Sequence, residues 1–177
     1  MGRRPDVTVA AIAETDGRFL VVEERINRRL LFNQPAGHVE RGETLFAAVV
    51  RETREETAWG FEPQALLGVY LWRNPTNRRK ILRFAFTGRV SDHNPAQHLD
   101  RGIIATHWLP REELEARQPR LRSPLVLRCV QDYLAGRRSP LDGTAQLELE
   151  SAAALGANVA PPADGSTVRA LEMTAAR

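Results

Sequence analysis

Three glutamates have the spacing in this 177-residue chain that points most directly to chemistry. Glu52, Glu55 and Glu56 stand at positions i, i+3 and i+4, so a helix would gather their carboxylates on one face. Clustered carboxylates repel one another unless a positive charge lies among them. Oxygen-rich clusters suit hard divalent cations, Mg²⁺ above all, and such an ion keeps coordination positions open for substrate phosphates. The glutamates therefore predict a metal site for a phosphate-bearing substrate.

An exposed helix with Glu–Arg pairs is the ordinary alternative. Arg51 and Glu55 are four residues apart, which is favourable, but an exposed pair contributes only about 0.3–0.5 kcal/mol. A wheel at about 100° per residue places Glu52 and Glu56 beside the expected buried arc, where a solvating charge run does not belong. That arc comprises Leu45, Phe46, Val49, Val50 and Thr53. The helix by itself leaves both interpretations open.

The pattern of apolar residues and turn formers predicts the elements around these glutamates. Strands are expected at residues 7–13, 18–24, 65–73, 81–90 and 102–109, with a turn at 15–17 and an extended segment at 30–33. The helix should run from Leu45 to about Thr57, with Thr44 or Glu43 capping its first N–H groups. A short helix opens at Pro110, and a last one begins with Ser123 as its cap and ends near Gly136. Strands alternating with about three helices predict an α/β or α+β fold with a mixed sheet.

Composition separates one globular domain from a tail. The chain is 42% hydrophobic and 27% charged, which suits a single domain, expected at residues 1–140. Residues 141–177 are rich in Ala, Pro and Gly and should be loosely structured, although 144–150 alternates and could add an edge strand. The sequence contains no apolar run of about 18 residues, so no membrane-spanning helix is expected. The single cysteine, Cys129, and an N-terminus without an apolar signal core predict a reducing cytoplasm.

The net charge of +3 comes almost entirely from arginine, because Lys80 is the one lysine among 25 basic residues. The planar arginine fork matches phosphate oxygens, which hints at anionic substrates. The codon bias of a GC-rich genome would produce the same composition. Since the arginines are scattered rather than gathered in a stripe, nucleic acid is not the expected partner.

The spacing of the whole stretch from Gly37 to Trp59 favours a metal site over an exposed helix with ion pairs. It resembles the Nudix box, G-x5-E-x7-R-E-U-x-E-E-x-G-U, at six positions: Gly37, Glu43, Arg51, Glu52, Glu55 and Glu56. Six such matches should arise by chance about once in 10⁵ chains of this length. Two positions depart from the box: Ala58 replaces a glycine, and Thr53 fills an apolar slot. If the helix must end in a left-handed residue at position 58, Ala costs about 1 kcal/mol, and Gly60 could instead end the helix.

Segments outside the box are similar to the bacterial NudJ-type phosphatase branch of the Nudix family. They lie at residues 7–10, 19–24, 33–38, 82–84 and 121–126, and the resemblance spans roughly residues 5–138. It implies an α/β/α sandwich around a mixed sheet, with the box forming a loop-helix-loop. It also implies an Mg²⁺-dependent (or Mn²⁺-dependent) phosphohydrolase that acts on nucleoside di- and triphosphates and on pyrophosphate esters of the thiamine pathway, releasing orthophosphate. The alternatives are another substrate, such as ADP-ribose or an oxidised nucleotide, and a nucleotide-binding regulator without turnover.

The resemblance assigns roles to individual residues. Four residues would supply metal ligands, through side chains or a backbone carbonyl: Gly37, Glu52, Glu55 and Glu56. Arg51 and Glu43 would orient those ligands. The general base would be Glu52 or, from a loop outside the box, Asp100.

Three further residues are candidates for substrate binding. Arg83 lies in the matching segment 82–84 and would contact substrate phosphates, with a solvent-facing strand arginine as the alternative. Arg122 is a similar candidate, and His38 beside Gly37 could hydrogen-bond near the site or simply support the loop. The expected partner is a small nucleotide or pyrophosphate, and the chain could act as a monomer or a homodimer.

Overall fold

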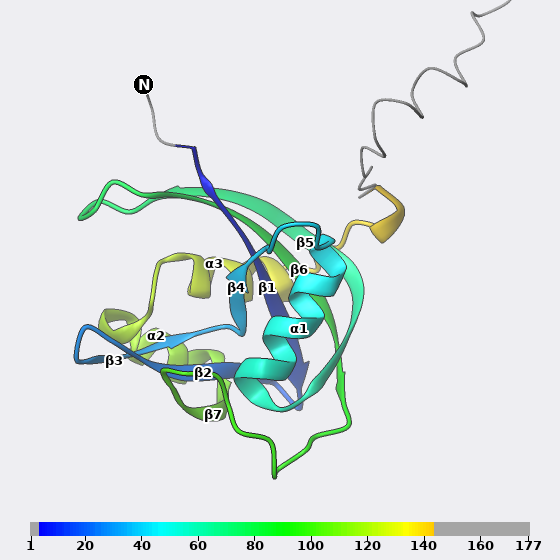
Figure 1. Cartoon of the computed structure of the whole chain (residues 1–177), viewed down its shortest axis with the longest axis horizontal. Helices are drawn as coiled ribbons and strands as arrows, with labels where there is room; N and C mark the ends of the chain where they lie inside the picture. Colours follow the sequence, from blue (N-terminus) through cyan, green and yellow to red (C-terminus); the bar gives the residue numbers. More distant parts are fainter. Residues whose placement is uncertain (1–3, 144–177) are drawn as a thin grey trace, which may run out of the picture. The chain divides into compact units, whose positions relative to one another are not determined.

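The computed structural model describes residues 4–143, which form a mixed sheet with helices on both faces (Figure 1). The elements in chain order are β1 (Asp6–Thr15), β2 (Arg18–Ile26), β3 (Arg29–Asn33), β4 (Ala36–His38), α1 (Leu45–Thr57), β5 (Gly60–Arg73), β6 (Lys80–Ser91), β7 (Ile103–Pro110), α2 (Arg111–Ala116) and α3 (Leu125–Leu134). Two 3₁₀ turns, Gln118–Arg120 and Leu141–Gly143, complete the described part. The tail predicted at residues 141–177, including the alternating segment 144–150, lies almost entirely outside the described residues.

Strand β1 is the centre of the sheet, whose order is β3-β2-β1-β6-β5. It pairs in parallel with β6, from Asp6 opposite Ile81 to Ala13 opposite Gly88, while the remaining pairings are antiparallel. The short β4 also pairs with β1, and β7 pairs with β2. The predicted mixed sheet is therefore confirmed.

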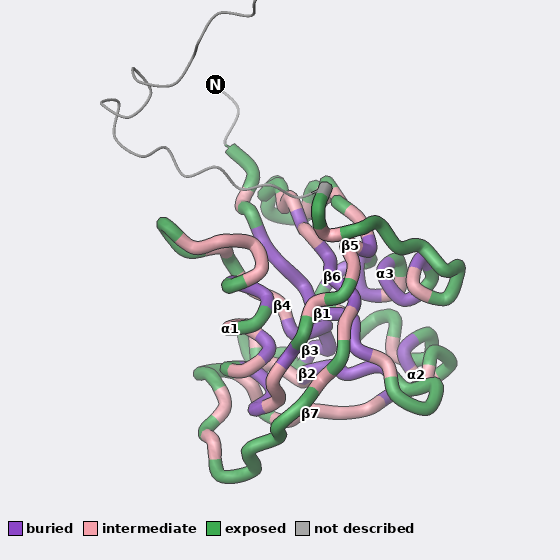
Figure 2. Tube along the Cα trace, turned by 90° about the vertical axis from the view of Figure 1, so that its right-hand side faces the viewer, coloured by how far each residue is buried: buried purple, intermediate pink, exposed green. Residues whose placement is uncertain are grey.

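The alternation of β1 builds a core on each face of the sheet. Val9, Ala11 and Ala13 belong to the cluster that packs beneath α1, and Ala10 and Ile12 belong to the cluster that packs beneath α2 and α3. All five are essentially inaccessible to solvent. Figure 2 shows α1 on one side of the strands and α2 and α3 on the other, with the buried trace between them. Period-two burial on a central strand is what a three-layer sandwich requires, so the predicted α/β/α architecture is confirmed.

Two strands depart most from the sequence prediction, β5 at its start and β4 as a whole. Strand β5 begins at Gly60, five residues before the predicted start, because a register shift between Pro63 and Ala65 lets the ladder continue past a proline that cannot donate. Residues 36–38 form β4, a strand too short for its pattern to be visible in the sequence. This strand matters for the site, because it lays Gly37 beside Val9 of β1.

Helix α1 ends at the residue that departs from the Nudix box. Ala58 has φ 60° and ψ 9°, and its N–H donates to the Arg54 carbonyl, so Ala58 itself adopts the left-handed conformation. The suggestion that Gly60 ends the helix is therefore wrong; Gly60 begins β5. Thr44 caps the other end, since its side chain accepts the Ala47 N–H at 3.0 Å.

Two predicted side-chain environments are wrong. Val50, predicted in the buried arc, is 37% exposed, because the arc is centred near Val49 and Val50 lies about 100° further round the helix. Ser123 does not cap α3 with its side chain: its carbonyl accepts the Val126 N–H, while its buried hydroxyl makes no hydrogen bond.

Within residues 4–143, no helix combines the length and apolarity needed to span a bilayer.

Candidate active site

Strand β4 and helix α1 bring Gly37 and Glu52 into contact, although fifteen positions separate them in the chain. A Cβ added to Gly37 would lie 2.0 Å from Oε1 of Glu52. That distance is far inside van der Waals contact, so the Glu52 carboxylate occupies the space that any other side chain at position 37 would need. Glycine is required here for close approach, not for an unusual backbone angle.

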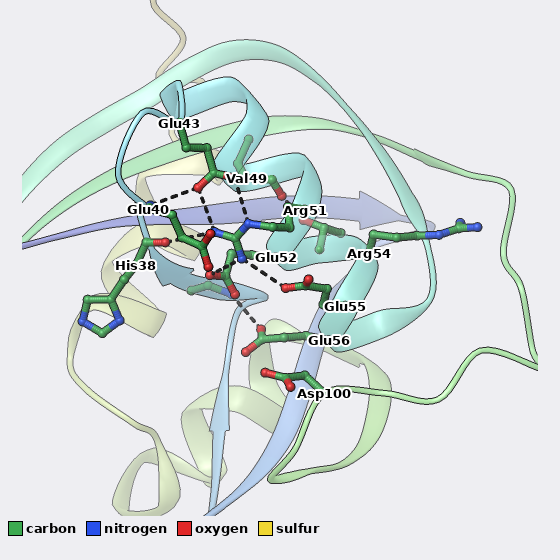
Figure 3. Close-up of polar contacts among 12 residues, drawn as sticks. His38, Glu40, Glu43, Val49, Arg51, Glu52, Arg54, Glu55, Glu56 and Asp100 are labelled. Carbon is green, nitrogen blue, oxygen red and sulfur yellow. Dashed lines mark hydrogen bonds and ion pairs between the residues drawn. The ribbon is translucent and has the colours of Figure 1, made fainter.

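The guanidinium of Arg51 holds the loop and the helix together (Figure 3). Its Nε and Nη2 donate to the two oxygens of Glu43 at 2.8 and 2.9 Å, and Nη2 also donates to the His38 carbonyl at 3.1 Å. Its Nη1 donates to Glu52 at 2.9 Å and to Glu55 at 3.1 Å. Hydrogen bonds to Glu43 above all raise the pKa of Arg51, so the group stays charged. Arg51 and Glu43 therefore contact the carboxylates that the sequence analysis expects them to orient, and the orienting role itself stays a prediction.

Glu56 is the most buried acid of the group, with 8% of the residue exposed. Its Oε2 accepts the backbone N–H of Ala36 at 2.9 Å. Burial nevertheless raises the pKa of Glu56 to about 8, and the nearby charges of Glu52 and Asp100 act in the same direction. Burial also raises the pKa of Glu52, against the favourable pairing with Arg51. In the ligand-free protein, burial first and the neighbouring acids second therefore disfavour the charged form of Glu56.

Asp100 joins the glutamates from outside the Nudix box. Its backbone N–H donates to the Glu55 carbonyl at 2.8 Å, which ties the loop before β7 to the end of α1. Figure 3 shows its carboxylate beside that of Glu56. Glu55, at 48% side-chain exposure, lies at the solvent side of the same group.

These residues line one depression of about 500 Å³, which we call the acidic hollow. Five carboxylates and one guanidinium surround it: Glu40, Glu52, Glu55, Glu56, Asp100 and Arg51. The oxygen donors and the excess of negative charge fit a hard divalent cation. Within residues 4–143 no three acidic, His or Cys side chains already converge in coordination geometry, because Arg51 and the Ala36 N–H hold several of the oxygens. Cation binding would therefore need these carboxylates to turn toward the ion.

The three predicted substrate residues do not all face the acidic hollow. His38 borders it, but its imidazole points away from the carboxylates in Figure 3, and its carbonyl pairs with Arg51. Arg83 is only 5% exposed, so the solvent-facing alternative is wrong, and its Nη1 lies 3.5 Å from Gln34 Oε1. Arg83 and Arg122 line a second, smaller cavity of about 170 Å³ instead.

This second cavity adjoins the acidic hollow, because Ala36, Gly37 and His38 line both. We call it the polar cavity. Its wall includes Thr8, Glu24 and Asn33, polar residues to which sequence reasoning gave no role in binding, and Ser123, which it explained as a helix cap. The available signal was weak, since each is a polar residue within or next to an apolar strand or helix pattern. Their convergence depends on pairing between distant segments.

The fold and the acidic box together define a Nudix hydrolase, and the chain belongs to that family. The model of the NUDIX domain matches residues 2–128. The chain is 41% identical over 139 residues to the phosphatase NudJ of Escherichia coli strain K12, covering 78% of this chain and 90% of the relative.

Solved structures agree with this assignment. A NUDIX hydrolase from Nitrosomonas europaea superimposes with a TM-score of 0.80 at 43% identity, covering 81% of this chain and 98% of the other. A MutT protein from Methanosarcina mazei Go1 superimposes with a TM-score of 0.61 at 22% identity, covering 78% of this chain and all of the other, which supports the fold alone.

Proposed function

We propose that this Nudix hydrolase is an Mg²⁺-dependent phosphohydrolase that cleaves the phosphoanhydride of nucleoside di- and triphosphates and of thiamine-pathway pyrophosphate esters, releasing orthophosphate. The observation that carries the proposal is the charge of the acidic hollow, where five carboxylates face one guanidinium. The similarity to NudJ, which is named a phosphatase, supports this choice within the family. The box itself recognises only the phosphates shared by all such substrates.

Four residues would hold the cation: Glu52, Glu55 and Glu56 by their carboxylates and Gly37 by its carbonyl. When bound, the cation neutralises charge on the leaving phosphate and lowers the pKa of the attacking water. Arg51 keeps Glu52 and Glu55 at the rim of the hollow through its two Nη1 hydrogen bonds. Glu43 fixes Arg51 in turn, by its bidentate pair at 2.8 and 2.9 Å.

Glu52 is our first choice for the general base. Its carboxylate lies against Gly37 in the wall of the hollow, and burial raises its pKa above that of an ordinary glutamate. A raised pKa makes a carboxylate a better proton acceptor. Asp100 is the alternative, because its loop holds it beside Glu56 (Figure 3).

The base assignment is tested by Glu52→Gln and Asp100→Asn, assayed at saturating Mg²⁺. We expect Glu52→Gln to abolish the turnover rate while Asp100→Asn retains a measurable one. If Asp100→Asn alone removes turnover, the base is Asp100.

The function is tested by a hydrolysis screen over nucleotides and pyrophosphate esters, with and without Mg²⁺. We expect Mg²⁺-dependent release of orthophosphate that falls at least about 10²-fold in Glu56→Gln, beyond the 10–100-fold typical of residues that only orient ligands. The matched control is Glu112→Gln, on the exposed side of α2. Metal-independent release, or full activity in Glu56→Gln, would refute the proposal. Release of pyrophosphate or of two monophosphates would reassign the enzyme to the ADP-ribose or oxidised-nucleotide type of substrate.

We also infer a cytoplasmic enzyme, from the single cysteine, which is fully buried in α3. Whether it acts as a monomer or a homodimer is measured by light scattering on the full chain.

A further inference from the structure

The segment between β6 and β7, residues 92–102, contacts the end of α1 at several points, and we call it the docked loop. It is the green segment that joins β6 to β7 in Figure 1. Its residues are exposed except Gln97 and Leu99, which are half-buried. A segment with so little buried apolar surface opens easily unless hydrogen bonds hold it. The hydrogen bonds between the docked loop and α1 therefore decide where the loop lies.

Two backbone N–H groups of the docked loop donate to carbonyls at the end of α1. The Asn94 N–H donates to the Ala58 carbonyl at 3.0 Å, and the Asp100 N–H donates to the Glu55 carbonyl at 2.8 Å. The last carbonyls of a helix lack partners within the helix, so they are available to a neighbouring loop. Glu55 also lines the acidic hollow, so the second hydrogen bond joins Asp100 to a helical turn that carries the glutamates.

The start of the docked loop has supports of its own. Nη1 of Arg54 donates to the Asp92 carbonyl at 2.7 Å, and the imidazole of His93 stacks on the Trp59 ring with 4.5 Å between ring centroids. These contacts fix the loop where it leaves β6. They lie several residues before Asp100, so the part of the loop that carries this acid needs a further support.

Gln97 supplies a contact in that second part through its side chain. Its Nε2 donates to the Arg54 carbonyl at 2.6 Å, one residue before Glu55 in the helix. Its own N–H donates to the Asn94 carbonyl at 3.0 Å, which closes a turn at this point of the loop. The Arg54 carbonyl also accepts the Ala58 N–H at 2.9 Å, so it keeps a partner without Gln97. The Gln97 amide therefore contributes to the position of the loop more than to the stability of the helix.

Asp100 has to be held against a repulsive force. Its carboxylate lies beside that of Glu56 in Figure 3, and it lines the acidic hollow although it belongs to a loop. Its negative charge opposes those of Glu52 and Glu56. In the metal-free protein this repulsion favours a loop that moves away from α1. A displacement of about 1 Å at a reacting group can cost about 10²-fold in rate, so the position of Asp100 matters for turnover.

We propose that Gln97 is a positioning residue for the acidic hollow: its amide holds the docked loop on α1 so that Asp100 lies beside Glu56. Gln97 lines neither the acidic hollow nor the polar cavity, so it acts through Asp100 and does not touch the substrate. This inference rests on the proposed function, because Asp100 contributes to turnover only if the hollow binds a cation and phosphates. A residue that merely capped α1 would change stability without changing the effect of Asp100.

The first test is amide hydrogen exchange of Asp100, measured by NMR on the metal-free full chain and on Gln97→Met. Methionine has a similar length but no donor. Loss of one neutral hydrogen bond shifts a local opening equilibrium by about 2–10-fold. We expect the Asp100 amide to exchange faster by about this factor, while the amides of β1 are unchanged. The matched control is Gln64→Met, an exposed position of β5, which should leave Asp100 unaffected. Equal exchange of Asp100 in Gln97→Met and in the unaltered protein would overturn the proposal.

The second test is steady-state kinetics at saturating Mg²⁺, which shows whether Gln97 acts through Asp100. Gln97→Met should lower kcat by no more than Asp100→Asn does, and KM should not change. The double variant Gln97→Met/Asp100→Asn should have the kcat of Asp100→Asn alone. Gln97→Lys should restore part of kcat, because an ammonium can donate to the last carbonyls of a helix. If Gln97→Met lowers kcat by the same factor with and without Asp100, the positioning role is wrong.

The two proposals fail separately. Hydrogen exchange requires neither metal nor substrate, so an unchanged Asp100 amide refutes only the role of Gln97. Absence of Mg²⁺-dependent turnover in the unaltered protein would refute the proposed function. The exchange rates would then still decide whether Gln97 holds Asp100 on the helix.

Discussion

The acidic hollow and the polar cavity share the wall formed by β4, yet their charges differ. In each a glutamate is removed from solvent, Glu56 fully and Glu24 partly, and this burial raises the pKa of both. The other charges around Glu56 are mostly acids, Glu52 and Asp100 among them. Those around Glu24 are arginines, Arg83 and Arg122.

This difference decides what each depression can bind. Excess negative charge can be relieved by a divalent cation, which in turn attracts phosphates. Around Glu24 two arginines face one carboxylate, so this cavity has no excess of acids for a cation and keeps directional donors and acceptors. The hollow would act on the phosphates, and the cavity lies beside it across the shared wall of β4.

The largest effect should come from breaking the charge balance of the polar cavity. Arg83→Met removes one of the two arginine charges near Glu24 and takes the buried donor away from Gln34 Oε1, so we expect the free energy of unfolding to fall by up to about 3 kcal/mol. The double variant Glu24→Leu/Arg83→Met removes both charges and should recover most of that loss. Urea unfolding measures the free energy of unfolding of the single and the double variant. A double variant as unstable as the single one would show that the two charges do not compensate each other.

Gly37→Ala should nearly abolish activity, since the new Cβ would lie 2.0 Å from the Glu52 carboxylate. Displacing that group by about 1 Å can cost about 10²-fold in rate. Gly42→Ala is the control: it lies in the same loop at φ +79°, with nothing within 4 Å of the new Cβ, so it should lose stability and keep turnover. Equal rates in the two variants would contradict the close-approach argument.

Arg51→Lys should lower kcat/KM by about 10–100-fold. An ammonium cannot reproduce the fork that joins Glu43, Glu52 and Glu55. The loss should be partly restored by higher Mg²⁺, because the ligands are misplaced and not removed. Arg111→Lys, which changes an arginine paired with the exposed Glu115, is the control and should behave like the unaltered enzyme.

The metal-free protein should lose stability as pH rises from about 4.5 to about 8. The folded state holds a proton on Glu56 up to about pH 8, while the unfolded state releases it near the ordinary value of 4.5. Folding therefore takes up protons in this window, and stability falls by at most about 1.4 kcal/mol per pH unit for one proton. Mg²⁺ should flatten the slope by replacing the proton. Urea titrations between about pH 4.5 and pH 8, with and without Mg²⁺, measure the free energy of unfolding at each pH. A free energy of unfolding that rises with pH in the metal-free protein would contradict the prediction.

The smallest effect should come from Ala58→Gly, at the end of the helix that carries the acidic hollow. Ala58 adopts a left-handed backbone at φ 60°, which is unfavourable for alanine, so glycine should raise the free energy of unfolding by about 1 kcal/mol. Substrate preference should not change, because Ala58 lines neither depression. Ala47→Gly is the control at a helical position of the same helix, where glycine should instead lower the free energy of unfolding by a similar amount.

Local chemistry made much of the fold and of the acidic hollow predictable. The helix from Leu45 to Thr57 follows from apolar spacing and from Thr44, and its glutamates share a face because i, i+3 and i+4 must do so on any helix. Alternation within β1 likewise puts Val9, Ala11 and Ala13 on one side of the strand, which is the side that packs against α1 in the structure. These features depend on residues within a few positions of one another.

The polar cavity could not be predicted, because its residues meet only through the sheet. Period two in a strand tells which side chains share a face, but not that Thr8 stands opposite Arg83 or that Ser123 closes the same space. The same holds for Gly37 against Glu52 and for Asp100 beside Glu56. The sequence by itself determined which atoms could bind a cation; the tertiary structure decided which polar atoms were buried without partners, since burial is a property of packing between distant segments.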